Sequence, residues 1–187
     1  MAAVVESGHH GLLDRVSRGF TLIEILIALS VFAFLIMLAG PMYSEFMANS
    51  QIRNRAESAL AGVRLAQNEA IKRNAQAKLA TTANGWQVSW FNDETSAFEV
   101  LQSYDFSEGA LKTTAVADQQ QVTFNGIGRV ISPNPGDGNP PMTRIRVTNP
   151  SVASSRELDV VISSLATGTK LCDPDPGVAA SDPRACP

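Results

Sequence analysis

With 187 residues and a net charge of −3, the chain is long enough for one globular domain and shows no basic excess of the kind that nucleic-acid binding favours. Its only histidines are His9 and His10, so the rest of the chain lacks the residue that Ser-His-Asp catalysis, Cys-His catalysis and His-based metal sites require. There is also no G-x-x-x-x-G-K-S/T phosphate loop, and we expect neither an enzyme nor a bound cofactor or metal.

Residues 1–19 form a polar leader with no apolar core of its own. The basic residues Arg15 and Arg18 lie just before a long apolar run. By the positive-inside rule such residues stay in the cytoplasm, so we expect everything after the run to lie outside it.

Residues 20–41 contain the apolar run. Between Phe20 and Ala39 the only ionisable side chain is Glu24, and thirteen residues are Leu, Ile, Val or Phe. About 20 such residues in a helix, at ~1.5 Å each, span roughly the 30 Å of a bilayer core. Their insertion free energy, about −0.3 to −0.6 kcal/mol each, exceeds the cost of one acid near a helix end. The sequence therefore predicts a transmembrane helix with an unexplained carboxylate.

The segment Arg18-Gly19-Phe20-Thr21-Leu22-Ile23-Glu24 resembles the processing site of type IV prepilins. This resemblance implies that a prepilin peptidase cuts after Gly19 and that the new N-terminal Phe20 is N-methylated. It also implies that Glu24 pairs with the N-terminal amine of a neighbouring subunit during filament assembly. Pro41 lies where many pilins carry a helix-kinking proline.

Two plainer interpretations compete with it. A secretory signal peptide has an apolar region of about 7–15 residues that ends in a small-x-small cleavage site, and the run here is longer. Pro41 directly follows Gly40, which disfavours cleavage at that point. A plain single-pass anchor explains the length of the run but gives no reason for Glu24.

After the run, the soluble head of residues 42–187 begins with a predicted amphipathic helix over 42–77. We expect the helix to be interrupted or bent near Gly40-Pro41, because proline removes a helix hydrogen bond. Small and apolar residues then recur at spacings of three and four, as on one face of a helix. They are Ile52, Ala56, Ala59, Val63, Ala66 and Ala70. We expect this stripe to dock on a sheet, with a parallel coiled coil as the weaker alternative.

The rest of the head, residues 78–172, is predicted to form a sheet with loops. Strands are expected at 78–82, 85–91, 97–103, 120–124, 143–148, 157–162 and 168–172, because short alternating segments are separated there by turn residues. The last two should form a hairpin. The segment 132–141 is rich in proline and glycine and should be an exposed loop. Arg144 and Arg146 are two residues apart and should share the solvent-facing side of their strand.

Two stretches of the head, 65–74 and 122–129, are similar to the GspH/FimT family of minor pilins and pseudopilins. The resemblance implies an α+β fold in which one long N-terminal helix packs on a small antiparallel β-sheet.

Cys172 and Cys186 lie at the two ends of a C-terminal tail, 172–187. Because the anchor implies export, we expect a disulfide that closes a loop of about 15 residues, worth roughly 3 kcal/mol. Two free thiols or half of a zinc site are the alternatives, and the absence of nearby histidines disfavours zinc.

Three functions follow from these resemblances. The chain is a structural minor type IV pilin of the pilus or its tip or initiation complex, a minor pseudopilin of a type II secretion system, or a pilin that captures DNA. The first two imply an inner-membrane protein with a single span and a periplasmic head, which then enters a pilus or pseudopilus. They also imply as partners other pilins or pseudopilins, prepilin peptidase, the inner-membrane assembly platform and membrane lipid.

For the DNA hypothesis, the Gly-Arg-x-Arg motif of some FimT-like pilins corresponds here to Gly168-Thr169-Lys170-Leu171, in which both arginines are missing. The head residues 80–187 carry twelve acidic and seven basic side chains. Any DNA contact is predicted to use Lys170 and Arg184 first, then Arg144 and Arg146.

Overall fold

The computed structural model describes residues 19–106, 113–163 and 168–187, so the predicted leader over 1–18 lies outside the described residues. The chain divides into two compact units, Met1–Gly40 and Pro41–Pro187. The helix α1 runs over Leu22–Arg73 and includes Pro41 without a break. Of the two outcomes predicted near Gly40-Pro41, an interrupted helix or a bent one, the interruption does not occur.

The C-terminal end of α1 differs from the prediction, which extended the helix to residue 77. Asn74 adopts a left-handed backbone conformation with φ 48°, and its N–H bonds to the carbonyl of Ile71 at 3.2 Å. The N–H of Ala75 reaches back to the carbonyl of Ala70 at 3.1 Å. This pair of bonds is a Schellman cap, which satisfies the last carbonyls and ends the helix at Arg73.

Eight strands follow α1 in the described residues of the head. They are β1 (Ala77–Thr82), β2 (Gly85–Asn92), β3 (Ala97–Asp105), β4 (Thr114–Ala117), β5 (Gln121–Phe124), β6 (Arg144–Thr148), β7 (Leu158–Val161) and β8 (Lys170–Cys172). Seven of them correspond to predicted strands within a few residues. The short strand β4 was not predicted, because its four residues carry little alternation and three of them are exposed.

The strands form two antiparallel sheets rather than the one that was predicted. The first has the order β3-β2-β1-β5 and the second the order β4-β6-β7-β8. The predicted closing hairpin is confirmed, since β7 pairs with β8 in antiparallel register. No strand is assigned within 132–141, as expected for that loop.

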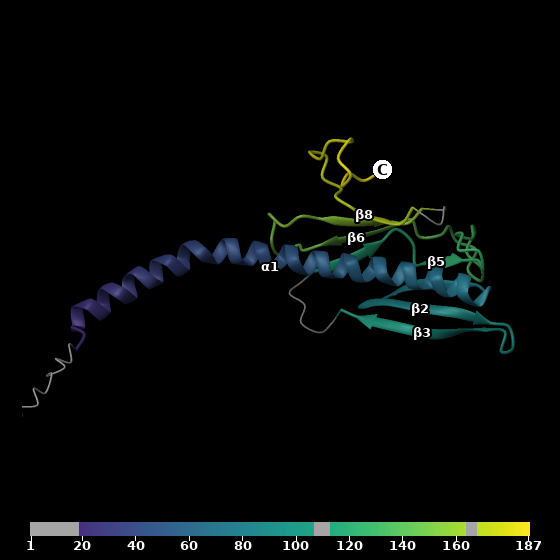
Figure 1. The fold of residues 1–187 in the computed structure, drawn as a ribbon, viewed down its shortest axis with the longest axis horizontal. Helices are drawn as coiled ribbons and strands as arrows, with labels where there is room; N and C mark the ends of the chain where they lie inside the picture. The colour runs from purple at the N-terminus through teal and green to yellow at the C-terminus, as the bar shows by residue number, and fades with distance from the viewer. Residues whose placement is uncertain (1–18, 107–112, 164–167) are drawn as a thin grey trace, which may run out of the picture. The chain divides into compact units, whose positions relative to one another are not determined.

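The second half of α1 packs against both sheets (Figure 1). All six residues of the predicted stripe are buried, with at most 2% of their surface exposed. They share one core with Leu79, Val88 and Phe124 from the first sheet and with Ile145, Val147 and Val160 from the second. The sheets of the same chain thus cover the stripe, which leaves no surface there for a parallel coiled coil.

Two close contacts explain why the helix can lie so near the first sheet. A Cβ built on Gly62 would lie 2.8 Å from Cδ1 of Leu79 and 3.0 Å from the ring of Trp86. The missing side chain makes room for both. The observed fold is α+β, with one long N-terminal helix packed on antiparallel sheets, as predicted.

Candidate functional site

The first candidate site is the start of α1. Gly19, Phe20 and Thr21 precede the helix, and Thr21 caps it: its Oγ1 accepts a hydrogen bond from the N–H of Glu24 at 3.3 Å. Threonine is a favoured N-cap because it satisfies a backbone donor that has no partner inside the helix. Glu24 lies in the first turn, where its negative charge is favoured by the helix dipole. The local sequence therefore places Glu24 less than two turns from Phe20 on a well-formed helix end.

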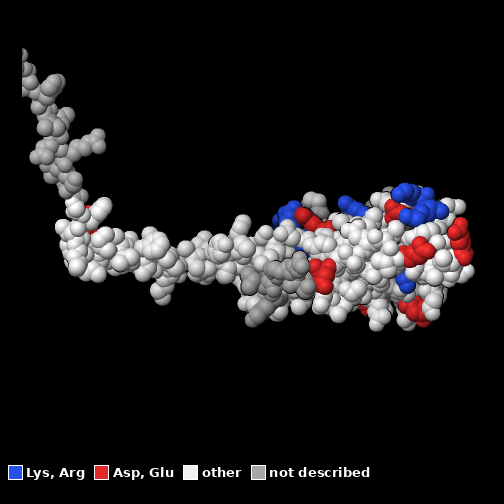
Figure 2. All heavy atoms as spheres, turned by 90° about the horizontal axis from the view of Figure 1, so that it is seen from below, with Lys and Arg blue, Asp and Glu red and all other residues white. Residues whose placement is uncertain are grey.

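The surface of α1 from Leu22 to Gly40 is apolar and exposed. Every residue in this range is exposed, and Phe20 just before it has 79% of its surface accessible. In Figure 2 this part of the helix is free of Lys and Arg, and acidic atoms are visible only near its start. In the described part of the chain α1 is the one helix long and apolar enough to cross a membrane. Such a surface is stable only when lipid or other protein covers it.

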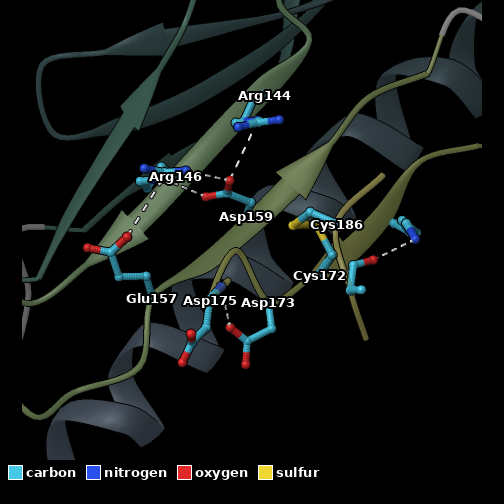
Figure 3. The surroundings of a disulfide bond; sticks show 10 residues. Arg144, Arg146, Glu157, Asp159, Cys172, Asp173, Asp175 and Cys186 are labelled. Atoms are coloured by element: carbon cyan, nitrogen blue, oxygen red, sulfur yellow. Dashed lines mark hydrogen bonds and ion pairs between the residues drawn. A yellow bond between two sulfur atoms is a disulfide. The ribbon is translucent and has the colours of Figure 1, made fainter. Parts of the chain in front are cut away.

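The second candidate site is the outer face of the second sheet, where β6 and β7 bring two arginines over one carboxylate (Figure 3). Arg146 donates from Nε and Nη2 to the two carboxylate oxygens of Asp159, at 2.9 and 3.0 Å. Nε of Arg144 lies 3.5 Å from the same carboxylate. Asp159 is fully buried, whereas the arginine side chains are 42% and 44% exposed.

This cluster changes the interpretation of the two arginines. They do share one side of β6, with Ile145 and Val147 buried on the other. That side is not simply open to water, because both side chains converge on Asp159. The hydrogen bonds to Asp159 raise the pKa of Arg146, since they stabilise its charged form.

The C-terminal tail lies beside this cluster. Cys172 is paired across the strands with Asp159, and Cys172 forms a disulfide with Cys186 (Figure 3). The N–H of Asp173 donates to the carbonyl of Arg184 at 2.7 Å, and Nζ of Lys170 donates to the carbonyl of Ala185 at 3.0 Å. The tail is thus attached to the end of β8 by a covalent bond and by two hydrogen bonds.

Each basic residue proposed for DNA contact has an interaction partner in the protein. Lys170 bonds to the backbone of the tail, and Arg184 pairs with Asp182 at 2.7 Å. This pairing lowers the pKa of Asp182 to about 2, mainly through the side-chain hydrogen bond from Arg184. The three arginines are therefore paired with carboxylates, and Lys170 is bonded to a backbone carbonyl.

Sequence analysis missed Asp159. A signal was available: Glu157 and Asp159 have the same spacing of two as Arg144 and Arg146, and facing strands place opposite charges side by side. In the regions that the structure describes, no group of three or more His, Cys, Asp or Glu side chains is arranged to hold a metal ion.

Comparisons with known proteins match both parts of the chain. A family model described as type II transport protein GspH matches residues 55–166, and one described as a prokaryotic N-terminal methylation motif matches residues 14–40. No curated protein matches the chain. A crystal structure of the type IV minor pilin FimU from Pseudomonas aeruginosa PAO1 is similar, with 16% sequence identity and a TM-score of 0.47. The similarity covers 68% of this chain and 91% of that one.

Proposed function

This chain belongs to the family of type II transport protein GspH, and on that premise we propose that it is a minor type IV pilin. The family consists of structural pilin and pseudopilin subunits rather than enzymes, and its members assemble with other such subunits. The finer assignment is to the pilus itself, or to the complex at its tip that starts assembly.

One observation carries this proposal: a methylation-motif match at residues 14–40 and a GspH match at residues 55–166 occur in one chain, joined by α1. The exposed apolar part of α1 begins directly after Gly19-Phe20, so cleavage after Gly19 leaves a free amine at the start of the helix. In the proposal a prepilin peptidase makes this cut and Phe20 is then N-methylated. The helix anchors the subunit in the bacterial inner membrane, with the head in the periplasm.

Glu24 has a specific role in this proposal. A carboxylate in an apolar surrounding is costly unless a cation is near, and the methylated amine of a neighbouring subunit is a cation. The proposed pair joins two subunits that lie side by side, so it favours assembly and register, and the apolar run outweighs the cost of Glu24 to insertion. Pro41 is proposed to let the helix adapt its local hydrogen bonding within the filament, since it lacks an N–H. The inner-membrane platform and membrane lipid complete the set of proposed partners.

The test is the fraction of the protein found in filaments sheared from its host. Glu24→Ala should still insert in the membrane, because it removes a cost, but should be lost from filaments. Ser30→Ala is the matched control, since Ser30 is polar, exposed and bonded only within the helix, to the carbonyl of Ile27 at 2.8 Å. It should behave as the wild type. Normal incorporation of Glu24→Ala would refute the proposal for Glu24.

A minor pseudopilin of a type II secretion system is the second candidate, favoured by the description of the matching family. The disulfide-closed tail leads us to prefer the pilus. Deletion of the gene distinguishes the two. Loss of surface pili with normal protein secretion supports the pilus, and blocked secretion with normal pili supports the pseudopilus.

A further inference from the structure

A groove of about 390 Å³ lies where α1, the start of β7 and the C-terminal tail meet in the head. Asn49, Ile52 and Arg53 of α1 line one side of it. Arg156 and Leu158 line a second side, and the third is formed by Leu171, Cys172, Asp173 and Arg184. None of these residues belongs to the apolar part of α1 that the proposed function places in the membrane.

The groove carries an excess of positive charge. Three arginines line it against one carboxylate, that of Asp173. Two of them have partners, because Arg53 pairs with Glu57 at 2.8 Å and Arg184 pairs with Asp182 at 2.7 Å. Among the described residues, the guanidinium of Arg156 has no hydrogen-bond or ion-pair partner, although its backbone N–H is bonded. In the described part of the chain, Arg156 and Asp173 are therefore the two lining charges without an ion-pair partner, and the exposed guanidinium of Arg156 offers five N–H donors.

Between these polar side chains the groove has apolar walls, and they are held in place. Ile52 and Cys172 are 1% and 2% exposed, and Leu158 and Leu171 pack on the core. The backbone next to the free guanidinium is tied to α1, since the N–H of Arg156 donates to Oδ1 of Asn49 at 2.8 Å. The disulfide fixes the opposite wall. A preformed groove loses little conformational entropy when it is occupied.

The distribution of charge favours a single carboxylate over a polyanion. Nucleic acid requires several cations along its backbone, and its affinity comes from the number of phosphates neutralised. Around the groove the tail instead carries Asp173, Asp175 and Asp182, which would repel neighbouring phosphates. One acidic side chain on an otherwise apolar segment needs only one cation and meets less repulsion than a row of phosphates.

We propose that this groove binds an Asp or Glu side chain of a neighbouring filament subunit, with Arg156 as the residue that recognises it. The inference rests on the proposed function, because it takes the neighbour to be another pilin or pseudopilin. It adds a contact between heads to the contact that α1 makes in the filament. The chemistry of the partner is thereby fixed: an apolar segment with one carboxylate.

Arg156→Lys allows a direct test, because a carbodiimide joins an amine only to a carboxylate in contact with it. Filaments carrying this variant in the full chain are treated with the reagent, and linked peptides are identified by mass spectrometry. The expected product links residue 156 to an Asp or Glu of another filament subunit. Arg129→Lys is the control, since Arg129 is exposed, distant in sequence and also without a side-chain partner in the described residues. No such link, or a link only to Asp173 of the same chain, would overturn the inference.

Charge reversal gives an independent readout. Arg156→Glu should lower the amount of protein in filaments by about tenfold, as expected for a lost charge pair, while Arg129→Glu should not. Replacing the linked Asp or Glu of the neighbouring subunit by lysine should restore the amount of Arg156→Glu in filaments. If wild type fails to enter filaments, the proposed function fails. If Arg156→Glu enters filaments to the same extent as Arg129→Glu, only the present inference fails. The inference would also be overturned if the wild type bound DNA, Arg156→Glu abolished that binding, and Arg156→Lys gave no link to a carboxylate.

Discussion

Asp159→Asn should destabilise the head strongly, although Asp159 does not itself line the groove proposed as an assembly contact. The substitution keeps the shape of the side chain and removes its charge. Two charge-assisted hydrogen bonds from Arg146, at 2.9 and 3.0 Å, would be weakened, and the amide NH₂ would face a guanidinium. The ion pair with Arg144 at 3.5 Å would be lost as well.

The magnitude follows from burial. Breaking a fully buried pair costs about 3–5 kcal/mol, because it leaves a charge without a partner in the interior. Here the charges left behind are arginines that are 42% and 44% exposed, so water compensates for part of the loss. We therefore expect Asp159→Asn to lower the free energy of unfolding by about 2–3 kcal/mol.

Urea denaturation of residues 42–187, followed by circular dichroism at neutral pH, measures this change. This fragment is suitable because the whole core cluster lies within it. Glu157→Gln is the matched control: its carboxylate lies 3.8 Å from Arg146 but is half exposed. An exposed pair contributes about 0–1 kcal/mol, so the control should remain close to the wild type. An Asp159→Asn variant as stable as Glu157→Gln would refute the reasoning.

Three further predictions concern the head. Replacing Cys172 and Cys186 together by serine should cost about 3 kcal/mol in urea denaturation, because the unfolded chain regains the entropy of an open loop; an unchanged midpoint would contradict this. Gly62→Ala should destabilise by about 1–2 kcal/mol in spite of alanine's higher helix propensity, because its Cβ would overlap Leu79; a gain in stability would show that the core yields easily. Asp182 should titrate by NMR with a pKa of about 2. Its pairing with Arg184 therefore stabilises the fold at pH values above 3.8, the ordinary pKa of the group, and this stabilisation is lost as the pH falls toward 2. Titration near 3.8 would mean that the pair with Arg184 does not form.

The apolar run and the helical stripe were predictable because each follows a single local rule. The run depends on hydropathy and length, and the stripe from Ile52 to Ala70 depends on a period close to 3.5. Most strands were found for the same reason, since alternation of side chains is a local property. The end of the helix was placed too late, because Asn74 acts as a cap only through its left-handed backbone, which its sequence context does not reveal.

What the sequence left open depends on contacts between distant segments. Nothing local divides the strands into two sheets, because β1 pairs with β5 across more than thirty residues of chain. The burial of Asp159 depends on the register between β6 and β7. The groove around Arg156 forms where α1, β7 and the tail meet, so no local sequence motif in any one of them predicts it.

The central claim is that Gly19-Phe20 is a processing junction at the start of an assembly helix. Intact-mass and N-terminal peptide analysis of the protein purified from filaments of its host tests this claim most directly. The account predicts a chain that begins at Phe20 and carries one added methyl group on its α-amine. A chain that retains Met1, or that begins at any residue other than Phe20, would contradict it.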